Sequence, residues 1–283
     1  MTMILVVGAH GMLGRDLMEV LAGEVRGVDI EEIDITSLES VRRMLLTLRP
    51  HIVINAAAYT DVDGCETNRE LAMQVNGEGV AHLALTCREI GAKLVQLSTD
   101  YVFDGSKNQP WLEDDPPNPL SVYGESKLAG ELNAAIAADH LIVRTQWLYG
   151  LGGKNFVETM LRLAGEKKEL AVVDDQIGSP TWTVDLARAI RSLIEKECRG
   201  IYHAANSGTC SWNEFARAIF ETAGCDVLVK PLTTSELGRP AARPLYSVLN
   251  CGKLERDTGF APQPWRDALS TYLETRRASH GGR

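Results

Sequence analysis

Thr99, Tyr123 and Lys127 are the residues whose types and spacing could perform acid–base chemistry in this chain. Tyr123 and Lys127 are four positions apart, so a helix would place both on one face. A free phenol, with a pKa of about 10, is a poor acid or base at neutral pH. A neighbouring ammonium and an oxidised nicotinamide would both stabilise the phenolate and lower that pKa. Tyr123 could then protonate a carbonyl oxygen while a hydride reaches the carbon, which predicts carbonyl reduction.

The other two residues would assist at the same point. Thr99 follows the apolar segment 94–98 and could offer its hydroxyl to the same carbonyl oxygen, and Lys127 could also bind the nicotinamide ribose. A Tyr and a Lys at this spacing often occur by chance. The glycine loop described next, and the absence of a competing nucleophile motif, favour the functional interpretation.

A glycine-rich loop follows the first apolar segment, 4–7, and precedes a helical pattern. Three glycines at positions 8, 11 and 14 meet three needs of a dinucleotide site: a tight turn, close approach of the pyrophosphate, and packing of helix on strand. Their G-x-x-G-x-x-G spacing is usual in short-chain dehydrogenases. From this loop we expect cofactor contacts at Gly8, His10, Gly11, Met12, Leu13 and Gly14. His10 would contribute through its backbone only.

Further cofactor candidates stand at the ends of the next apolar segments. Asp29 could accept hydrogen bonds from the adenosine ribose and would repel a 2′-phosphate, which favours NADH on charge alone. Asp34, followed by Ile35, precedes a helix and could meet the adenine amino group. Small side chains after the third segment would let a flat cofactor lie against the backbone, and these candidates are Ala56, Ala57, Ala58 and Tyr59. Solvated loop carboxylates, and alanines packed beneath a helix, are the alternatives.

The elements that must position these residues alternate along the first part of the chain. Strands are predicted at 4–7, 25–28, 52–55, 93–98 and 141–144, and helices at 12–22, 37–49, 69–90 and 121–138. Continuously apolar strands are typical of a parallel sheet that is covered on both faces. Regular strand–helix alternation indicates an α/β, doubly wound Rossmann fold.

The pattern changes after residue 150. We predict a dinucleotide-binding domain over 1–150, rejoined by a helix and a strand within about 182–205. Residues 151–181 and 206–283 would form a smaller C-terminal substrate-binding lobe over the carboxyl ends of the strands, where such sheets bind ligands. Ser211 and Glu214 have the spacing of a helix capping box. The tail 226–283 contains five prolines and is expected to be irregular.

Composition narrows the class of protein. With 283 residues, 45 % hydrophobic and 24 % charged, the chain can bury a large core. The net charge of −9 disfavours nucleic acid and anionic membranes as partners. Six cysteines without a C-x-x-C pair suggest reduced thiols. The apolar start is too short for a signal or a membrane span, so we expect a cytoplasmic protein.

Several segments resemble the dTDP-4-dehydrorhamnose reductase family of extended short-chain dehydrogenases. They are 55–60 (NAAAYT), 98–105 (STDYVFDG), 122–131 (VYGESKLAGE), 144–150 (RTQWLYG), 175–181 (DQIGSPT) and 243–244 (RP). The second and third are highly specific, and the resemblance runs from residue 3 to about 270. It implies reduction of the C4 ketone of dTDP-4-dehydro-6-deoxy-L-mannose by NAD(P)H, the last step in making dTDP-L-rhamnose for cell-surface polysaccharide.

The resemblance also implies roles for individual residues. Thr99, Tyr123 and Lys127 fall on the catalytic positions of the family, and Tyr123 and Lys127 on cofactor contacts as well. Substrate contacts fall on Thr99, Asp100 and Trp147, and an indole face packs well on a deoxyhexose. A buried structural tryptophan is the alternative for Trp147. Gln146 departs from the serine that is common in the family.

The resemblance leaves cofactor and assembly open. The family prefers NADPH or accepts both cofactors, which opposes the charge argument from Asp29, so the choice between NADPH and NADH stays open. Some bacterial members dimerise around a magnesium ion. A homodimer is therefore one expected arrangement, but no metal ligand is assigned in this chain.

Three other functions share this fold. A sugar-nucleotide 4,6-dehydratase has an acidic pair after the threonine, whereas Asp100 is followed here by Tyr101. An epimerase, which retains its NAD, is not excluded by the chemistry of the residues. A non-enzymatic regulatory subunit of methionine adenosyltransferase would not need the set of Thr99, Tyr123 and Lys127.

Overall fold

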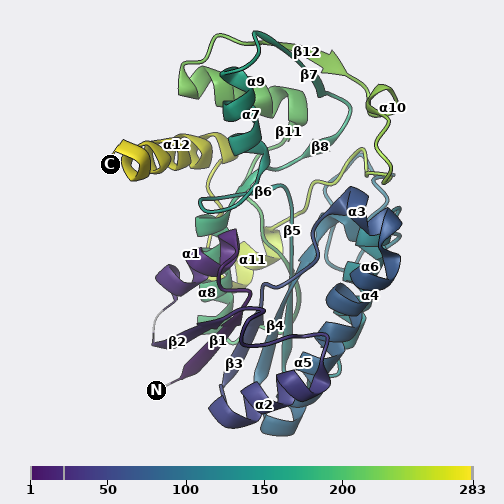
Figure 1. Ribbon diagram of the computed structural model, residues 1–283, viewed down its shortest axis with the longest axis vertical. Coiled ribbons are helices and arrows are strands. Elements are labelled where there is room, and N and C mark those ends of the chain that lie inside the picture. The colour runs from purple at the N-terminus through teal and green to yellow at the C-terminus, as the bar shows by residue number, and fades with distance from the viewer. Residues whose placement is uncertain (1, 22, 282–283) are drawn as a thin grey trace.

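A parallel sheet of six strands forms the centre of the computed structural model, which describes residues 2–21 and 23–281 (Figure 1). In spatial order its strands are β10 (Gly200–His203), β5 (His140–Thr145), β4 (Lys93–Thr99), β3 (Ile52–Asn55), β1 (Met3–Val7) and β2 (Glu24–Val28). Every pair is parallel. The chain passes to opposite sides of β1 to form β2 and β3, so the sheet has its switch point between β1 and β3. Ligands bind in the crevice at such points.

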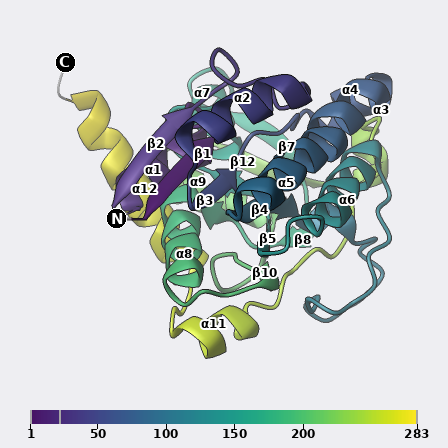
Figure 2. The ribbon, with the colours of Figure 1, turned by 90° about the horizontal axis from the view of Figure 1, so that it is seen from below.

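Helices cover both faces of the sheet, as Figure 2 shows. On one face lie α1 (Met12–Val20), α8 (Thr183–Glu195) and α11 (Gly252–Thr258), and on the other α2 (Leu38–Leu48), α5 (Gly79–Ile90) and α6 (Val122–Ala134). Alternate residues of one strand enter the two cores: Ile4 and Val6 pack toward α1 and α8, whereas Leu5 and Val7 pack toward α2 and α5. This double burial explains why β1 is continuously apolar. The predicted doubly wound fold is confirmed.

A second group of elements lies over the carboxyl ends of the strands (Figure 1). It contains the parallel pair β7 (Glu169–Val173) and β12 (Leu228–Leu232), with α7 (Phe156–Ala164), α9 (Trp212–Ala223) and α12 (Trp265–Gly281). These elements share an aromatic core that includes Tyr149, Phe215 and Tyr272. The predicted capping box at Ser211 and Glu214 is present. The predicted boundaries at 150, 181 and 206 stay a prediction; within 206–283, α11 packs on α8 and β10 of the sheet.

Short elements connect these groups. They are α3 (Val62–Thr67), α4 (Arg69–Met73), η1 (Gln74–Glu78), η2 (Asp100–Val102), β6 (Leu148–Tyr149), β8 (Ile177–Gly178), β9 (Thr181–Trp182), β11 (Cys210–Ser211) and α10 (Thr234–Leu237). No described helix is long and apolar enough to cross a membrane.

The expectation of an irregular tail is wrong for α12. Pro262 and Pro264 stand just before its first residue, Trp265, where a missing backbone N–H costs little. Its buried residues recur at helical spacing and are Trp265, Ala268, Leu269, Tyr272 and Leu273. The prolines therefore mark the beginning of a helix. Residue 22, the predicted end of the first helix, and residues 282–283 of the predicted lobe lie outside the described residues.

The helix predicted over 69–90 is divided into α4, a π-helical turn η1 and α5. Asn76 in η1 is buried and forms hydrogen bonds with Tyr59 in the loop after β3 and with Ser126 of α6. Gly130 of α6 lies so close that a Cβ there would stand 2.2 Å from the carbonyl oxygen of Asn76. An extra residue in one turn aims Asn76 at these partners and hardly alters the apolar periodicity of the sequence. π-Helical turns of this kind frequently occur at functional sites.

Candidate active site

The structure brings Thr99, Tyr123 and Lys127 together at the carboxyl end of β4. Thr99 is the last residue of that strand, and Tyr123 and Lys127 lie on consecutive turns of α6. Ser121 caps the helix by accepting a hydrogen bond from the backbone N–H of Gly124. The phenol of Tyr123 lies close enough to the side chain of Thr99 for Thr99 to lower the phenol pKa. Lys127 is buried, and its Nζ donates to the carbonyl oxygen of Leu97 at 2.7 Å.

Burial governs the charge of the two titratable groups. It raises the pKa of the Tyr123 phenol far above its usual value, the carboxylate of Asp100 raises it further, and Thr99 lowers it. Burial lowers the pKa of Lys127 to about 8, and Glu131 opposes that shift. Burial is the largest cause of the shift in the phenol pKa, and the lowering that we expect from the ammonium together with an oxidised nicotinamide stays a prediction. A phenol that is protonated at neutral pH is the form that donates a proton to a ketone.

Asp100, a predicted substrate contact, lies directly beside this set. It is buried, its Oδ1 accepts a hydrogen bond from Thr99 Oγ1 at 3.0 Å, and burial raises its pKa to about 7. Tyr101 follows and meets the ring of Tyr123 edge-on at 5.6 Å. One hydroxyl, on Thr99, thus lies beside both the carboxyl of Asp100 and the phenol of Tyr123.

The glycine loop fits tightly against the loop that follows β3. A Cβ on Gly8, which has φ of +82°, would lie 2.7 Å from the backbone nitrogen of Ala57. A Cβ on Gly14 would lie 2.1 Å from the carbonyl oxygen of Gly8. Gly11, by contrast, is exposed and caps the open N-terminal end of α1. Two of the glycines therefore allow close packing, and the third leaves the helix terminus accessible to a phosphate.

A cavity of about 300 Å³ opens between these loops. Its lining includes eight predicted cofactor residues: Gly8, Gly11, Asp29, Asp34, Ile35, Ala56, Ala57 and Ala58. Val7, Ile30, Ile33, Thr36 and Val75 complete it. These residues lie at the switch point of the sheet and combine apolar walls with two carboxylates. The cavity has the size and shape expected for one end of a dinucleotide.

The other cofactor candidates do not line this cavity. Leu13 and Gly14 are buried beneath the loop, and Tyr59 packs in a cluster with Cys65 and Tyr123. Met12 contacts Asn155, which is described below. The backbone N–H of His10 donates to Asp29 Oδ2 at 2.9 Å, and its imidazole stands 3.8 Å from the same carboxylate.

Trp147 has a partner that the sequence did not predict. Its indole stacks on that of Trp212 with centroids 3.6 Å apart, and its backbone has a φ of +47°, which is unusual for a bulky residue. Gly178 lies so close that a Cβ there would stand 2.5 Å from Cε2 of Trp147. Trp147 lies two residues after the end of β5, but Trp212 covers one face of its indole. The predicted contact with a sugar stays a prediction.

Asn76 is a site residue that sequence reasoning missed. Its Oδ1 accepts from the backbone N–H of Tyr59, and its Nδ2 donates to the carbonyl oxygen of Tyr59 and to Ser126 Oγ. It thereby joins the loop after β3 to the turn of α6 between Tyr123 and Lys127. The only signal in the sequence was a polar residue beside a glycine within an apolar helical pattern.

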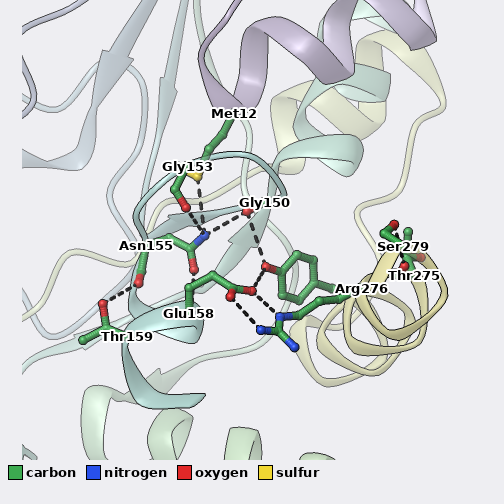
Figure 3. A network of polar contacts seen from close by, with 10 residues as sticks. Met12, Gly150, Gly153, Asn155, Glu158, Thr159, Thr275, Arg276 and Ser279 are labelled. Carbon is green, nitrogen blue, oxygen red and sulfur yellow. Dashed lines mark hydrogen bonds and ion pairs between the residues drawn. The ribbon is translucent and has the colours of Figure 1, made fainter. Parts of the chain in front are cut away.

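A polar network joins the glycine loop to the second group of elements (Figure 3). Asn155 Nδ2 donates to the carbonyl oxygens of Gly150 and Gly153 and contacts Met12 Sδ at 3.5 Å. Glu158, one turn along α7, forms an ion pair with Arg276 of α12. The start of α1 is therefore connected through Asn155 to α7, and through α7 to α12.

Replacing Gly14 by alanine should weaken dinucleotide binding by at least about tenfold. The added Cβ would meet the backbone of Gly8 and Ala9, which cannot yield as a flexible side chain would. Displacement of the loop would remove backbone contacts to phosphate. The dissociation constant can be measured by fluorescence titration with NADH and NADPH.

Gly165→Ala is the matched control for this variant. A Cβ there meets nothing nearer than 3.4 Å, and Gly165 has a φ of −74°. Dinucleotide binding by Gly165→Ala should equal that of the wild type. Equal binding by Gly14→Ala would contradict the role assigned to the loop.

Comparison with known proteins places these features in context. The family described as "RmlD substrate binding domain" matches residues 1–278. The chain is 47 % identical over 283 residues to the spore coat polysaccharide biosynthesis protein SpsK of Bacillus subtilis, covering 99 % of both chains. It is 46 % identical to a dTDP-4-dehydrorhamnose reductase of Streptomyces griseus, covering 94 % of this chain and 91 % of that one.

Solved structures agree with these relatives. A dTDP-4-dehydrorhamnose reductase of Bacillus anthracis in complex with NADP matches with a TM-score of 0.94 and 42 % identity, covering 97 % of this chain and 100 % of that one. A UDP-glucose 4-epimerase of Thermus thermophilus shares the fold, with a TM-score of 0.84, at only 23 % identity.

Proposed function

Because this chain belongs to the dTDP-4-dehydrorhamnose reductase family, we propose that it reduces the C4 ketone of dTDP-4-dehydro-6-deoxy-L-mannose to dTDP-L-rhamnose with NAD(P)H. This is the last step of dTDP-L-rhamnose synthesis. The observation that carries the proposal is the convergence of Thr99, Tyr123 and the buried Lys127 at the end of β4. The cavity between the loops that follow β1, β2 and β3 supports a nicotinamide dinucleotide as the cofactor.

The residues divide the work of ketone reduction. A bound nicotinamide would supply the hydride for C4. Tyr123, protonated at neutral pH, donates its proton to the C4 oxygen, and the hydroxyl of Thr99 hydrogen-bonds to the same oxygen. Lys127 can use the N–H groups not bound to Leu97 to hold the nicotinamide ribose and to stabilise the phenolate after proton transfer. Asp100 positions Thr99, and Trp147 packs against the sugar ring.

Two structural facts support these roles over those of related enzymes. Tyr101 packs against Tyr123 at the position where a dehydratase would have its second carboxylate. The chain is 46 % identical to the Streptomyces griseus reductase and 42 % identical to the Bacillus anthracis reductase, but 23 % identical to the epimerase. A non-enzymatic regulatory subunit would not need the set of Thr99, Tyr123 and Lys127 that this chain contains.

The assay is direct. The protein should oxidise NADH or NADPH when given the dTDP-linked 4-keto sugar, which is measured by loss of nicotinamide absorbance, and the product should be dTDP-L-rhamnose by NMR. A purified protein that retains NAD through repeated turnover would instead indicate an epimerase. A stoichiometric synthetase partner together with no ketone reduction would indicate a regulatory subunit.

We further propose that Asp29 shifts cofactor use toward NADH. Its two carboxylate oxygens accept from the backbone N–H groups of His10 and Ile30, which holds the charge at the wall of the cavity. A 2′-phosphate at that wall would meet a like charge, at a cost of about 1 kcal/mol or more. Asp29→Asn should therefore raise the ratio of kcat/KM for NADPH to that for NADH by roughly tenfold.

Asp34→Asn is the control, because Asp34 lines the same cavity beside Thr36. It should change kcat/KM for both cofactors alike. An unchanged ratio in Asp29→Asn would remove Asp29 from cofactor selection.

Among the described residues, the one group of three close ligand atoms belongs to His10, Asp29 and Glu31, of which Asp29 lines the cavity, and we propose no metal there. Nothing supports the magnesium ion considered from the resemblance. The homodimer and the cytoplasmic location stay predictions.

A further inference from the structure

Glu131 lies on the same face of α6 as the catalytic pair, one turn after Lys127 and two turns after Tyr123. Its side chain is only 4 % exposed. Its Oε1 accepts from Ser98 Oγ at 2.5 Å and from Arg144 Nε at 2.8 Å, and its Oε2 accepts from Arg144 Nη2 at 2.7 Å. A buried carboxylate with three such bonds is fixed in position.

These bonds join α6 to the two strands that carry the site. Ser98 immediately precedes Thr99 on β4, and Arg144 is paired with Ser98 across the β4–β5 ladder. One turn earlier, Lys127 binds the carbonyl oxygen of Leu97 on the same strand. The helix is therefore attached to the end of β4 at two successive turns. This double attachment fixes where Tyr123 stands relative to Thr99.

The charge of Glu131 also acts on Lys127. Both side chains are buried, and burial alone favours the neutral amine. Glu131 raises the pKa of Lys127 although Arg144 binds the same carboxylate.

The charged side chains on the elements around α6 interact with groups other than Lys127. Asp100 and Cys65 act on the phenol of Tyr123. Glu125 pairs with Arg69 of α4. Glu66 of α3 accepts from the backbone N–H of Val122, and Asp63 of α3 pairs with Arg239 and Arg243. Among the described residues, Glu131 is thus the charged side chain that acts on Lys127.

We propose that Glu131 is a positioning residue that keeps Lys127 charged at working pH and holds α6 against the end of β4. The inference rests on the proposed ketone reduction, in which the ammonium binds the ribose and stabilises the phenolate. Ser98 and Arg144 are the groups through which Glu131 is held.

The test compares Glu131→Gln with Glu125→Gln, the same change on an exposed residue of the same helix. Glu131→Gln should move the alkaline limb of kcat/KM for ketone reduction down by about 1 pH unit, because an uncharged neighbour lets the ammonium lose its proton sooner. Glu125→Gln should leave the limb in place. An unmoved limb in folded Glu131→Gln would overturn the proposal.

A second variant distinguishes an effect on Lys127 from an effect of misfolding. Glu131→Gln leaves Arg144 buried without its partner, which destabilises proteins strongly, whereas removal of both charges is often tolerated. Glu131→Gln with Arg144→Met should recover the melting temperature and still show the lowered limb. A stable double variant with the wild-type limb would show that Glu131 has only a structural role.

Binding separates this inference from the proposed function. The affinity for NADH, measured by fluorescence at a series of pH values, should fall over the same alkaline pH range as kcat/KM. In Glu131→Gln this fall in affinity should move to lower pH, as the alkaline limb of kcat/KM does. If the wild type does not reduce the sugar but this binding limb shifts, ketone reduction is wrong and the effect of Glu131 on Lys127 stands. If the wild type reduces the sugar and neither limb shifts, the inference on Glu131 is wrong.

Discussion

Replacing Tyr123 by phenylalanine should lower kcat for ketone reduction by at least about 10²-fold, the usual scale for loss of an acid catalyst. The variant loses the hydroxyl beside Thr99 and retains the ring that packs against Tyr101 and Cys65. Dinucleotide affinity should hardly change, because the phosphate contacts come from the glycine loop. Single-turnover kinetics with saturating NADPH would measure the loss in the chemical step.

Tyr101→Phe is the matched control, since it removes a phenol from the neighbouring ring. Arg243, and not Thr99, is the side chain that lowers the pKa of the Tyr101 phenol. It should therefore cost far less activity than Tyr123→Phe. A Tyr123→Phe variant with most of its activity, or a Tyr101→Phe variant that loses as much, would show that another group donates the proton.

The sheet could be predicted from the sequence because its signal is local. The strands β1 and β3 are buried on both faces and are mainly apolar, whereas β2 at the edge is partly exposed and contains Glu24 and Arg26. The turn after β1 requires glycine at position 8 because the loop after β3 lies in close contact with it. The π-helical turn and α12 were missed for different reasons. The π-helical turn changes the direction of the Asn76 side chain without disturbing the apolar periodicity of the helix. Helix α12 begins directly after prolines, which predict an irregular tail when they are considered alone.

The residue types of the site could be predicted from the sequence, but the pKa shifts of its titratable groups could not. A spacing of four residues placed Tyr123 and Lys127 on one helical face, and the strand end brought Thr99 to them. Contacts between residues far apart in the sequence decided the rest. Trp147 stacks on Trp212, 65 residues away, and burial raises rather than lowers the phenol pKa. Neither follows from local pattern.

The ammonium of Lys127 should set the alkaline limit of activity. Its pKa is lowered by burial to about 8, whereas that of Tyr123 is raised, so Lys127 loses its proton first as the pH rises. The active form, with protonated amine and protonated phenol, is then fully present well below pH 8. The wild-type kcat/KM should therefore fall as the pH rises through about 8.

Replacing Lys127 by methionine should weaken NADPH binding by about tenfold and lower kcat by about 10²-fold, because one side chain serves both the ribose and the phenolate. Lys93→Met is the control: Lys93 is also buried, and its Nζ likewise donates to a backbone carbonyl, that of Cys198, at the opposite end of β4. It should reduce stability and leave both constants near their wild-type values.

The pH profile of the residual activity completes this test. In Lys127→Met the limb near pH 8 should be absent, because the group that titrates there has been removed. Asp100 is the alternative source of a limb, since its pKa is raised to about 7 and its carboxyl gains charge as the pH rises. If a limb persists in Lys127→Met and disappears in Asp100→Asn, the hydroxyl of Thr99 responds to the carboxyl of Asp100, and the ammonium does not limit the reaction.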